Sequence, residues 1–417
     1  MVLTQDDFCI QDCACGKSHL TTIQKIVIES GCLTNLGRHL RELGYTQNIT
    51  AVYDTNTYTA ENLTRPAVDN EIILPAENLH ADEHGVELLK GKLNQPQLLV
   101  AIGSGTLHDI VRYCASQLNI PFVSVPTAAT VDGFASSVAA MTLNGFKKTL
   151  IVQAPVLVLA DLEVISAAPR HLVPAGVGDM LGKFICLADW EIAHLLTGEY
   201  YCGYIASLTR KAAEQVLIGA DKLAAKDVAA YENLMYGLIL SGIAMQLAGN
   251  SRPASGAEHH ISHLLEMGVL QHCDAMHGEK VGVATLLCSQ IYHKIAQVDD
   301  ISDNLVPYEP VDEPWIHEQF GRLAPEILIE NRADCLQNVS QEQLLKSWGS
   351  VQNILRAIPS PQQLAEVLLK LGGKVDFKDI GVDYSFTQQL ITLSPYVRNR
   401  LTVMRMLRIL KIEHLLE

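Results

Sequence analysis

The chain has 417 residues, of which 48% are hydrophobic and 18% charged, and it carries a formal net charge of -15. The length predicts more than one domain, and the composition excludes a disordered chain. The acidic balance argues against nucleic-acid binding. There is no basic segment followed by an apolar one at the N-terminus and no run of eighteen apolar residues, so we expect a cytoplasmic protein without a signal peptide or membrane span.

The N-terminal arm contains the one local cluster of cysteines in the sequence: Cys9, Cys13 and Cys15, followed by His19. A zinc site is one interpretation of this cluster. The spacing lacks the paired CxxC motifs of zinc-binding modules, and the ten cysteines of the chain are otherwise scattered, as reduced thiols are. The simpler interpretation is an exposed, thiol-rich arm.

The first 160 residues alternate short β-branched runs with segments of helical periodicity. One helix is expected at Cys32–Leu43. Strands are expected at Lys25–Ser30, Ile49–Asp54, Gln97–Gly105, Pro121–Ala128 and Val156–Asp161. Apolar strands that alternate with helices predict a parallel α/β sheet covered on both faces. We assign this domain to residues 1–165.

A glycine-containing turn follows the third predicted strand. Gly103 and Gly105 lack a Cβ atom, so a phosphate group can approach the backbone where the next helix begins. The spacing is not the Rossmann G-x-G-x-x-G. A tight turn between strand and helix without a ligand explains the motif equally well when it is considered alone.

The stretch Val125–Ala139 strengthens the nucleotide hypothesis, because it follows another strand and combines hydroxyl groups with small residues. Thr127, Thr130 and Ser136 offer donors for phosphate or ribose oxygens, although a Ser/Thr-rich turn is the usual interpretation. Asp54 ends an earlier strand and suits a ribose diol. Its charge would repel the additional phosphate of NADP, so we expect NAD to be preferred.

From about Pro169 the strand-like runs largely stop, and residues 166–417 predict a helical second domain. Long helical patterns occur at Leu181–Leu196, Tyr231–Ala248 and Val397–Leu416. Asp179 is expected at the start of an apolar helix, where a carboxylate commonly stabilises the helix dipole.

Five of the fifteen histidines lie between Ser255 and Lys280: His259, His260, His263, His272 and His277. Residues four apart lie on one face of a helix, so His259 and His263 point the same way. His260 and His263, three residues apart, could also share a face. Two imidazoles and the Asp179 carboxylate suit a catalytic divalent metal with an open position. Surface or capping histidines are the alternative. Periodicity does not decide between His259 and His260.

Taken together, these blocks resemble one family. CACG of the N-terminal arm, GSGTLHDI, PTAATVDGFAS, GVGDMLGK, SGAEHHISH, HGEKVG and SPYVRNRLTVMRML occur in an order that is similar to the sn-glycerol-1-phosphate dehydrogenases. That family is a branch of the iron-containing alcohol dehydrogenase and glycerol dehydrogenase group, and its fold is related to dehydroquinate synthase. The resemblance implies an N-terminal NAD-binding α/β domain and an all-α C-terminal domain, with the active site between them.

The resemblance also implies site residues and cofactors. The metal ligands are Asp179, His259 and His277, and the substrate-facing, catalytic positions are Asp132, Asp179 and His263. The cofactor positions are Asp54, Gly105, Thr106, Leu107, His108, Asp109, Thr127, Ala128, Ala129, Thr130 and Ser136. The implied cofactors are NAD, with NADP as an alternative, and one divalent metal ion per subunit: zinc, nickel or iron. Ser104, His108 and Thr130 depart from the usual Gly, Asn and Ser.

The expected reaction is the reversible reduction of dihydroxyacetone phosphate to sn-glycerol 1-phosphate by a homodimer or larger homo-oligomer. Two alternatives are a glycerol dehydrogenase that acts on the unphosphorylated triol and a non-catalytic nucleotide-binding relative. A cation that binds the substrate phosphate would distinguish the first alternative. The candidates are Lys147, Lys148, Arg252 and Lys280.

Overall fold

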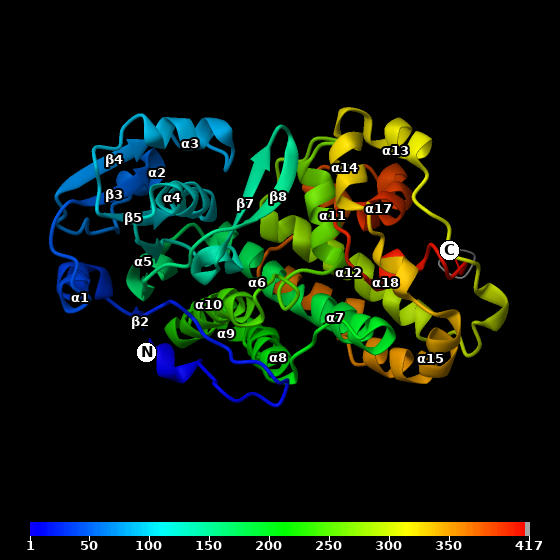
Figure 1. Ribbon diagram of the computed structural model, residues 1–417. Helices are drawn as coiled ribbons and strands as arrows, with labels where there is room; N and C mark the ends of the chain where they lie inside the picture. Colours follow the sequence, from blue (N-terminus) through cyan, green and yellow to red (C-terminus); the bar gives the residue numbers. More distant parts are fainter. Residues whose placement is uncertain (413–417) are drawn as a thin grey trace.

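A seven-stranded sheet forms the N-terminal part of the computed structural model, which describes residues 1–412 (Figure 1). The strands are β1 (Val2–Thr4), β2 (Lys25–Glu29), β3 (Ile49–Asp54), β4 (Asn70–Leu74), β5 (Leu98–Gly103), β6 (Phe122–Pro126) and β9 (Leu157–Asp161). Their spatial order is β1-β2-β9-β6-β5-β3-β4. All pairings are parallel except that of β1 with β2. The predicted parallel sheet is therefore confirmed.

The central strands are apolar because both of their faces are covered. All residues of β3, β5, β6 and β9 are buried. The accompanying helices are α1 (Leu36–Glu42), α2 (Thr55–Tyr58), α3 (Glu83–Lys90), α4 (Gly105–Leu118) and α5 (Leu162–Ala167). One apolar cluster joins the sheet to α1, and another joins it to α3 and α4. The continuous hydrophobic runs in the sequence follow from this two-sided burial.

A β-hairpin that the sequence analysis did not predict leaves the sheet between β6 and β9. It consists of β7 (Val138–Leu143) and β8 (Phe146–Ile151). Asn144 and Gly145 form its turn with φ of 54° and 76°. An Asn-Gly pair is a strong hairpin signal because both residues adopt positive φ readily. The hairpin reaches the helical part, where Lys147 and Lys148 pair with Glu266 and Glu326 (Figure 1).

The chain after α5 is helical, as predicted. The helices are α6 (Val173–Leu181), α7 (Lys183–Thr197), α8 (Gly203–Ile218), α9 (Ala220–Ala224), α10 (Val228–Ala248), α11 (Ala257–Glu266), α12 (His277–Ile295), α13 (Glu313–Phe320), α14 (Ala324–Glu330), α15 (Gln341–Arg356), α16 (Pro361–Lys370), α17 (Thr387–Leu393) and α18 (Val403–Met406). One apolar core joins them to β2 and β9 of the sheet. The division of the domains after residue 165 stays a prediction.

Two stretches of this helical part, Arg170–Thr197 and Val228–Ala248, are long and apolar enough to cross a membrane by length and composition alone. Their most apolar windows are 89% and 72% buried inside the protein. A helix that is apolar on all sides is typical of the core of a large protein, and here the protein itself covers it.

Two helix predictions were wrong. The predicted helix Val397–Leu416 is only the short α18, with residues 413–416 outside the described part. Tertiary hydrogen bonds account for the difference: the buried Arg405 guanidinium donates to the carbonyl oxygen of Arg398, and the Val403 amide donates to Asp189, so both backbone groups have partners outside a continuous helix. Asp179 lies near the end of α6 rather than at a helix start, so it does not cap a helix.

Candidate active site

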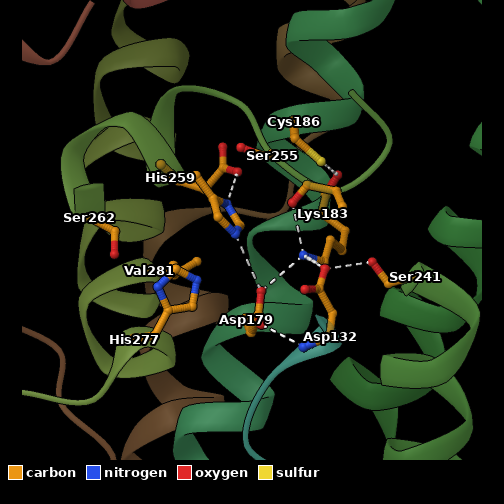
Figure 2. A network of polar contacts seen from close by, with 12 residues as sticks. Asp132, Asp179, Lys183, Cys186, Ser241, Ser255, His259, Ser262, His277 and Val281 are labelled. Carbon is orange, nitrogen blue, oxygen red and sulfur yellow. Dashed lines mark hydrogen bonds and ion pairs between the residues drawn. The ribbon is translucent and has the colours of Figure 1, made fainter. Parts of the chain in front are cut away.

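The three predicted metal ligands converge from three helices. Asp179 lies on α6, His259 on α11, and His277 is the first residue of α12. One ligand atom from each lies within 4.8 Å of the other two. Asp179 Oδ1 is 3.6 Å from His259 Nε2, and the two imidazole rings are 5.3 Å apart between centroids. Figure 2 shows the carboxylate and both rings facing one another.

Glycines bring two of these helices into backbone contact. A Cβ atom on Gly178 would lie 2.3 Å from the carbonyl oxygen of Gly278, and one on Gly278 would lie 1.9 Å from that of Ala175. Any larger residue at these positions would push α6 and α12 apart. The glycine beside Asp179 and the glycine beside His277 therefore set the distance between these two ligands.

Buried carboxylates orient both histidines. His259 Nδ1 is 2.6 Å from Glu258 Oε1, and His277 Nδ1 is 2.8 Å from Glu266 Oε1. Each ring thus donates through Nδ1, which leaves Nε2 as the lone-pair nitrogen for a metal ion. Such carboxylate–histidine pairs are the usual support of a metal site. The donor set and its orientation fit a divalent ion with three protein ligands and an open position, which is the catalytic arrangement.

Lys183, which the sequence analysis missed, connects the metal ligands to Asp132. Its fully buried ammonium lies 2.6 Å from Asp132 Oδ2 and 2.9 Å from Asp179 Oδ1 (Figure 2). Ser241 also donates to Asp132 at 2.8 Å, and the Asp132 amide donates to Asp179 at 2.9 Å. Burial raises the pKa of Asp179, but Lys183 and the histidines outweigh it and lower the pKa to about 2. The one available signal was that Lys183 follows Asp179 by one helical turn.

The other histidines of the cluster differ in their surroundings. His263 is buried with its ring centroid 6.0 Å from those of His259 and His277. Burial and, secondarily, the charge of Arg398 hold the pKa of His263 well below its usual range. His260 is buried on the side of the arginines, and neither ring nitrogen has a hydrogen-bond partner among the described residues. His272 is exposed and pairs with Asp274. The structure thus brings His259 rather than His260 to Asp179.

The predicted nucleotide residues lie at one edge of the sheet. β3, β5 and β6 are neighbours, and their carboxyl ends carry Asp54, the Gly105 turn and the Thr127 loop. A Cβ atom on Gly103 would lie 3.1 Å from Asp54 Oδ2, so the acid stands directly beside the turn. Asp54 also caps α2 through the Thr57 amide at 2.8 Å. Carboxyl ends of parallel strands are where open α/β sheets bind ligands.

Several predicted cofactor residues point their side chains inward. His108 hydrogen-bonds to the Ser104 carbonyl oxygen at 2.8 Å, and burial lowers its pKa to about 3. Asp109 pairs with Arg112, and Leu107 is fully buried. Ser136 donates to backbone oxygens of the chain and is also buried. At these positions α4 and the loop after β6 offer backbone groups more readily than side chains, with Thr106, Thr127 and Thr130 partly exposed.

A close contact joins the nucleotide loop to the metal-binding helix. A Cβ atom on Gly176 would lie 2.1 Å from the carbonyl oxygen of Ala129, which follows Ala128 in the loop. Gly176 precedes Asp179 by three residues. The predicted cofactor loop and the metal ligands therefore border one another, although they belong to the sheet and to the helical part.

Two of the four candidate phosphate-binding cations lie beside this group. Lys147 and Lys280 are 3.2 Å and 3.5 Å from the carboxylate oxygens of Glu266, the partner of His277. Lys148 instead pairs with Glu326, and Arg252 pairs with Glu199. Arg398, which the sequence analysis did not single out, lies near Lys147.

Comparison with known proteins identifies relatives over most of the chain. The iron-containing alcohol dehydrogenase family matches residues 27–169. A glycerol-1-phosphate dehydrogenase [NAD(P)+] from Bacillus licheniformis is 35% identical over 409 residues, which cover 95% of this chain and 91% of that protein.

Solved structures share the fold. A probable glycerol dehydrogenase from Sinorhizobium meliloti aligns with a TM-score of 0.61 at 16% identity, covering 92% of this chain and 94% of that one. A sulfoacetaldehyde reductase from Bifidobacterium kashiwanohense, solved with NAD+, has the same score and identity, with 95% and 98% covered. At 16% identity the structural likeness shows only a shared fold. The 35% identity to the Bacillus licheniformis protein shows the family. The chain belongs to the glycerol-1-phosphate dehydrogenases, within the iron-containing alcohol dehydrogenase group.

Proposed function

We propose that the protein reduces dihydroxyacetone phosphate to sn-glycerol 1-phosphate, reversibly, with NADH as the preferred hydride donor. The observation that carries this proposal is the position of the Asp179, His259 and His277 group. The predicted nucleotide loop borders it on the Asp179 side, and cationic side chains border it on the His277 side. A substrate bound between these features would have its phosphate group on the His277 side and the hydride donor on the Asp179 side.

Asp179, His259 and His277 would hold the divalent ion, with Glu258 and Glu266 fixing the two rings. When bound, such an ion polarises a carbonyl and stabilises the charge that develops on its oxygen. A bound nicotinamide would supply the hydride for the carbonyl carbon, and the protein would have to place a proton at the carbonyl oxygen. His263 is our candidate for placing this proton, directly or through water, because its ring lies next to both histidine ligands. The Asp132 amide and the Lys183 ammonium hold Asp179 in place, because each donates to one of its two carboxylate oxygens.

The cations near Glu266 support a phosphorylated substrate. Lys147 and Lys280 share this one carboxylate. Arg398 is buried, donates only to the oxygens of Val397, Lys147 and Thr149, and has no carboxylate within ion-pair distance among residues 1–412. Three cations stand against Glu266 and the more distant Glu330, which forms no ion pair with any of them among residues 1–412, and this leaves positive charge at this end of the site. We propose that Lys147, Lys280 and Arg398 bind the substrate phosphate.

Adjacent lysines on β8 allow a matched test of this assignment. Lys147→Gln should raise KM for dihydroxyacetone phosphate about 10-fold or more, because a charge-assisted hydrogen bond contributes about 1.5–3 kcal/mol. Its turnover of unphosphorylated dihydroxyacetone should hardly change. Lys148→Gln removes the neighbouring charge, which faces Glu326, and should leave both substrates unaffected. Equal activity of the parent enzyme on the two substrates would favour a glycerol dehydrogenase instead.

Asp54 carries the proposed preference for NADH. Its carboxylate stands beside the Gly103 turn, where the charge would meet the 2′-phosphate of NADPH. Asp54→Asn should lower the ratio of kcat/KM with NADH to kcat/KM with NADPH about 10-fold, which corresponds to about 1.4 kcal/mol. Equal ratios in the parent and the variant would remove Asp54 from this role.

We also propose that the enzyme works in the cytoplasm as a homodimer or larger homo-oligomer. Size-exclusion chromatography with light scattering would test the assembly. A non-catalytic nucleotide-binding protein, the remaining alternative, predicts no turnover with any added divalent metal.

A further inference from the structure

A second cluster of metal-binding side chains lies far from the site described above. It joins Cys13, Cys15 and His19 of the N-terminal arm to Cys202, which precedes α8. One ligand atom of each residue lies within 4.8 Å of all the others. The predicted local cluster was thus only partly right, because Cys9 turns away and accepts a hydrogen bond from the Thr21 amide, whereas Cys202 comes from more than 180 residues away.

Three of the six separations among the four ligand atoms lie close to the edges of a tetrahedron around one small ion, and the other three are within 4.8 Å. Cys13 Sγ is 3.6 Å from Cys202 Sγ, and His19 Nε2 is 3.2 Å from Cys15 Sγ and 3.3 Å from Cys202 Sγ. Zinc binds thiolate at about 2.3 Å and imidazole at about 2.0–2.1 Å, which gives edges of about 3.8 Å between sulfurs and about 3.6 Å between sulfur and nitrogen. The observed separations are slightly shorter than these edges.

The histidine of this cluster is oriented as a ligand. His19 is buried, and its Nδ1 lies 2.8 Å from the carbonyl oxygen of Leu247 on α10. A carbonyl oxygen only accepts, so Nδ1 carries the proton and Nε2 presents its lone pair to the three sulfurs. This second contact is what a metal-bound histidine commonly makes. Tyr200 adds a hydroxyl 3.5 Å from Cys15 Sγ, and Lys17 lies over the Tyr200 ring.

We propose that Cys13, Cys15, His19 and Cys202 bind one structural zinc ion. Three thiolates and an imidazole in a tetrahedral set are typical zinc ligands, and four protein ligands leave no position for a substrate. The ion would fasten the N-terminal arm, which leads into β2, to the start of α8 and to α10 in the helical part (Figure 1). Three thiolates on a divalent ion leave one net negative charge, and the Lys17 ammonium lies over the ring of Tyr200, whose hydroxyl is beside Cys15.

The test uses His277→Ala, which lacks one ligand of the catalytic site, so that zinc at the arm is counted alone. Elemental analysis of this variant should find about one zinc ion per chain. Adding Cys15→Ser, at a partly exposed position, should remove most of it, and adding Cys13→Ser should do the same. Cys9→Ser is the matched control: it removes a thiol of the same arm outside the cluster and should retain the zinc.

Cobalt substitution gives a second readout that needs no variant. Thiolate ligands give cobalt a strong charge-transfer absorption in the near ultraviolet, whereas the Asp179, His259 and His277 group contains no sulfur. The cobalt-loaded parent protein should show this absorption. Its absence, a His277→Ala protein without zinc, or a Cys13–Cys202 disulfide seen by intact mass as the loss of two hydrogens would each overturn the proposal.

Discussion

Among residues 1–412, the group at Asp179 and the group at Cys202 are two separate sets of side chains that could bind a metal ion, and they differ in ligand number, chemistry and support. The group at Asp179 draws three oxygen and nitrogen ligands from three helices, whereas the group at Cys202 draws four ligands, three of them sulfur. Three ligands leave a position for a reacting oxygen, and four close the coordination sphere. The reaction is therefore expected at the three-ligand group, and the four-ligand group is expected to fasten the chain.

The hydrogen-bond partners of the histidines also differ between the two groups. His259 and His277 rest on the carboxylates of Glu258 and Glu266, while His19 rests on a backbone carbonyl. A carboxylate orients the ring and also raises its basicity, which tunes the metal ion that the ring holds. A carbonyl mainly fixes the tautomer. Charged support therefore accompanies the catalytic group, and neutral support accompanies the group proposed to be structural.

Asp179→Asn is expected to give the largest difference in metal binding between the two groups. The substitution keeps the size of the side chain but removes the charge that faces His259 and Lys183, so the catalytic metal should be held weakly. Loss of about 4 kcal/mol of stabilisation corresponds to a fall of about 10³-fold in kcat/KM. Steady-state assays with titrated metal would measure it. Zinc at the arm should be unchanged, and its loss together with activity would contradict the independence of the two groups.

His263→Ala should have the next largest effect, because it removes a group proposed to place a proton without removing a ligand. We expect kcat to fall about 10²-fold while most of the catalytic metal is retained. The matched control is His260→Ala, on the same helix and equally buried. It should lower stability, because it leaves a cavity, but keep kcat within a few-fold of the parent. Loss of metal in His260→Ala and its retention in His259→Ala would show that the wrong histidine was assigned.

Glu258→Gln tests the charged support alone. The amide keeps a hydrogen-bonding oxygen near His259 Nδ1 but removes the negative charge, so affinity for the catalytic metal should fall about 10–100-fold. Competition with a chelator, read by activity, would measure this change. Unchanged affinity would mean that the carboxylate only positions the ring, as the Leu247 carbonyl does for His19.

The sequence was sufficient where the determinants are local. β-branched runs predicted five strands of the sheet. Helical spacing indicated a group of histidines near Asp179, and the family resemblance implied the choice of His259 and His277. The sequence was insufficient where the fold joins distant residues: nothing near Cys13 indicates Cys202, and Lys147 was only one of four candidate cations among which the sequence does not choose. The Val397–Leu416 segment has helical periodicity, but its arginines and Asp189 supply the backbone with other partners, so tertiary hydrogen bonds prevailed over propensity.

The smallest effect on catalysis is expected from Cys15→Ser in the otherwise unchanged chain. The thiol belongs to the group proposed to be structural, so kcat/KM for dihydroxyacetone phosphate should stay within about two-fold, since the catalytic ligands are untouched. The Tm should fall by several °C, because about 1 kcal/mol shifts Tm by about 2–4 °C in domains of 150–250 residues. Cys9→Ser controls for the loss of a thiol from the arm and should leave the Tm within about 1 °C. A large loss of activity without a change in Tm would place Cys15 in catalysis and reverse the contrast between the two groups.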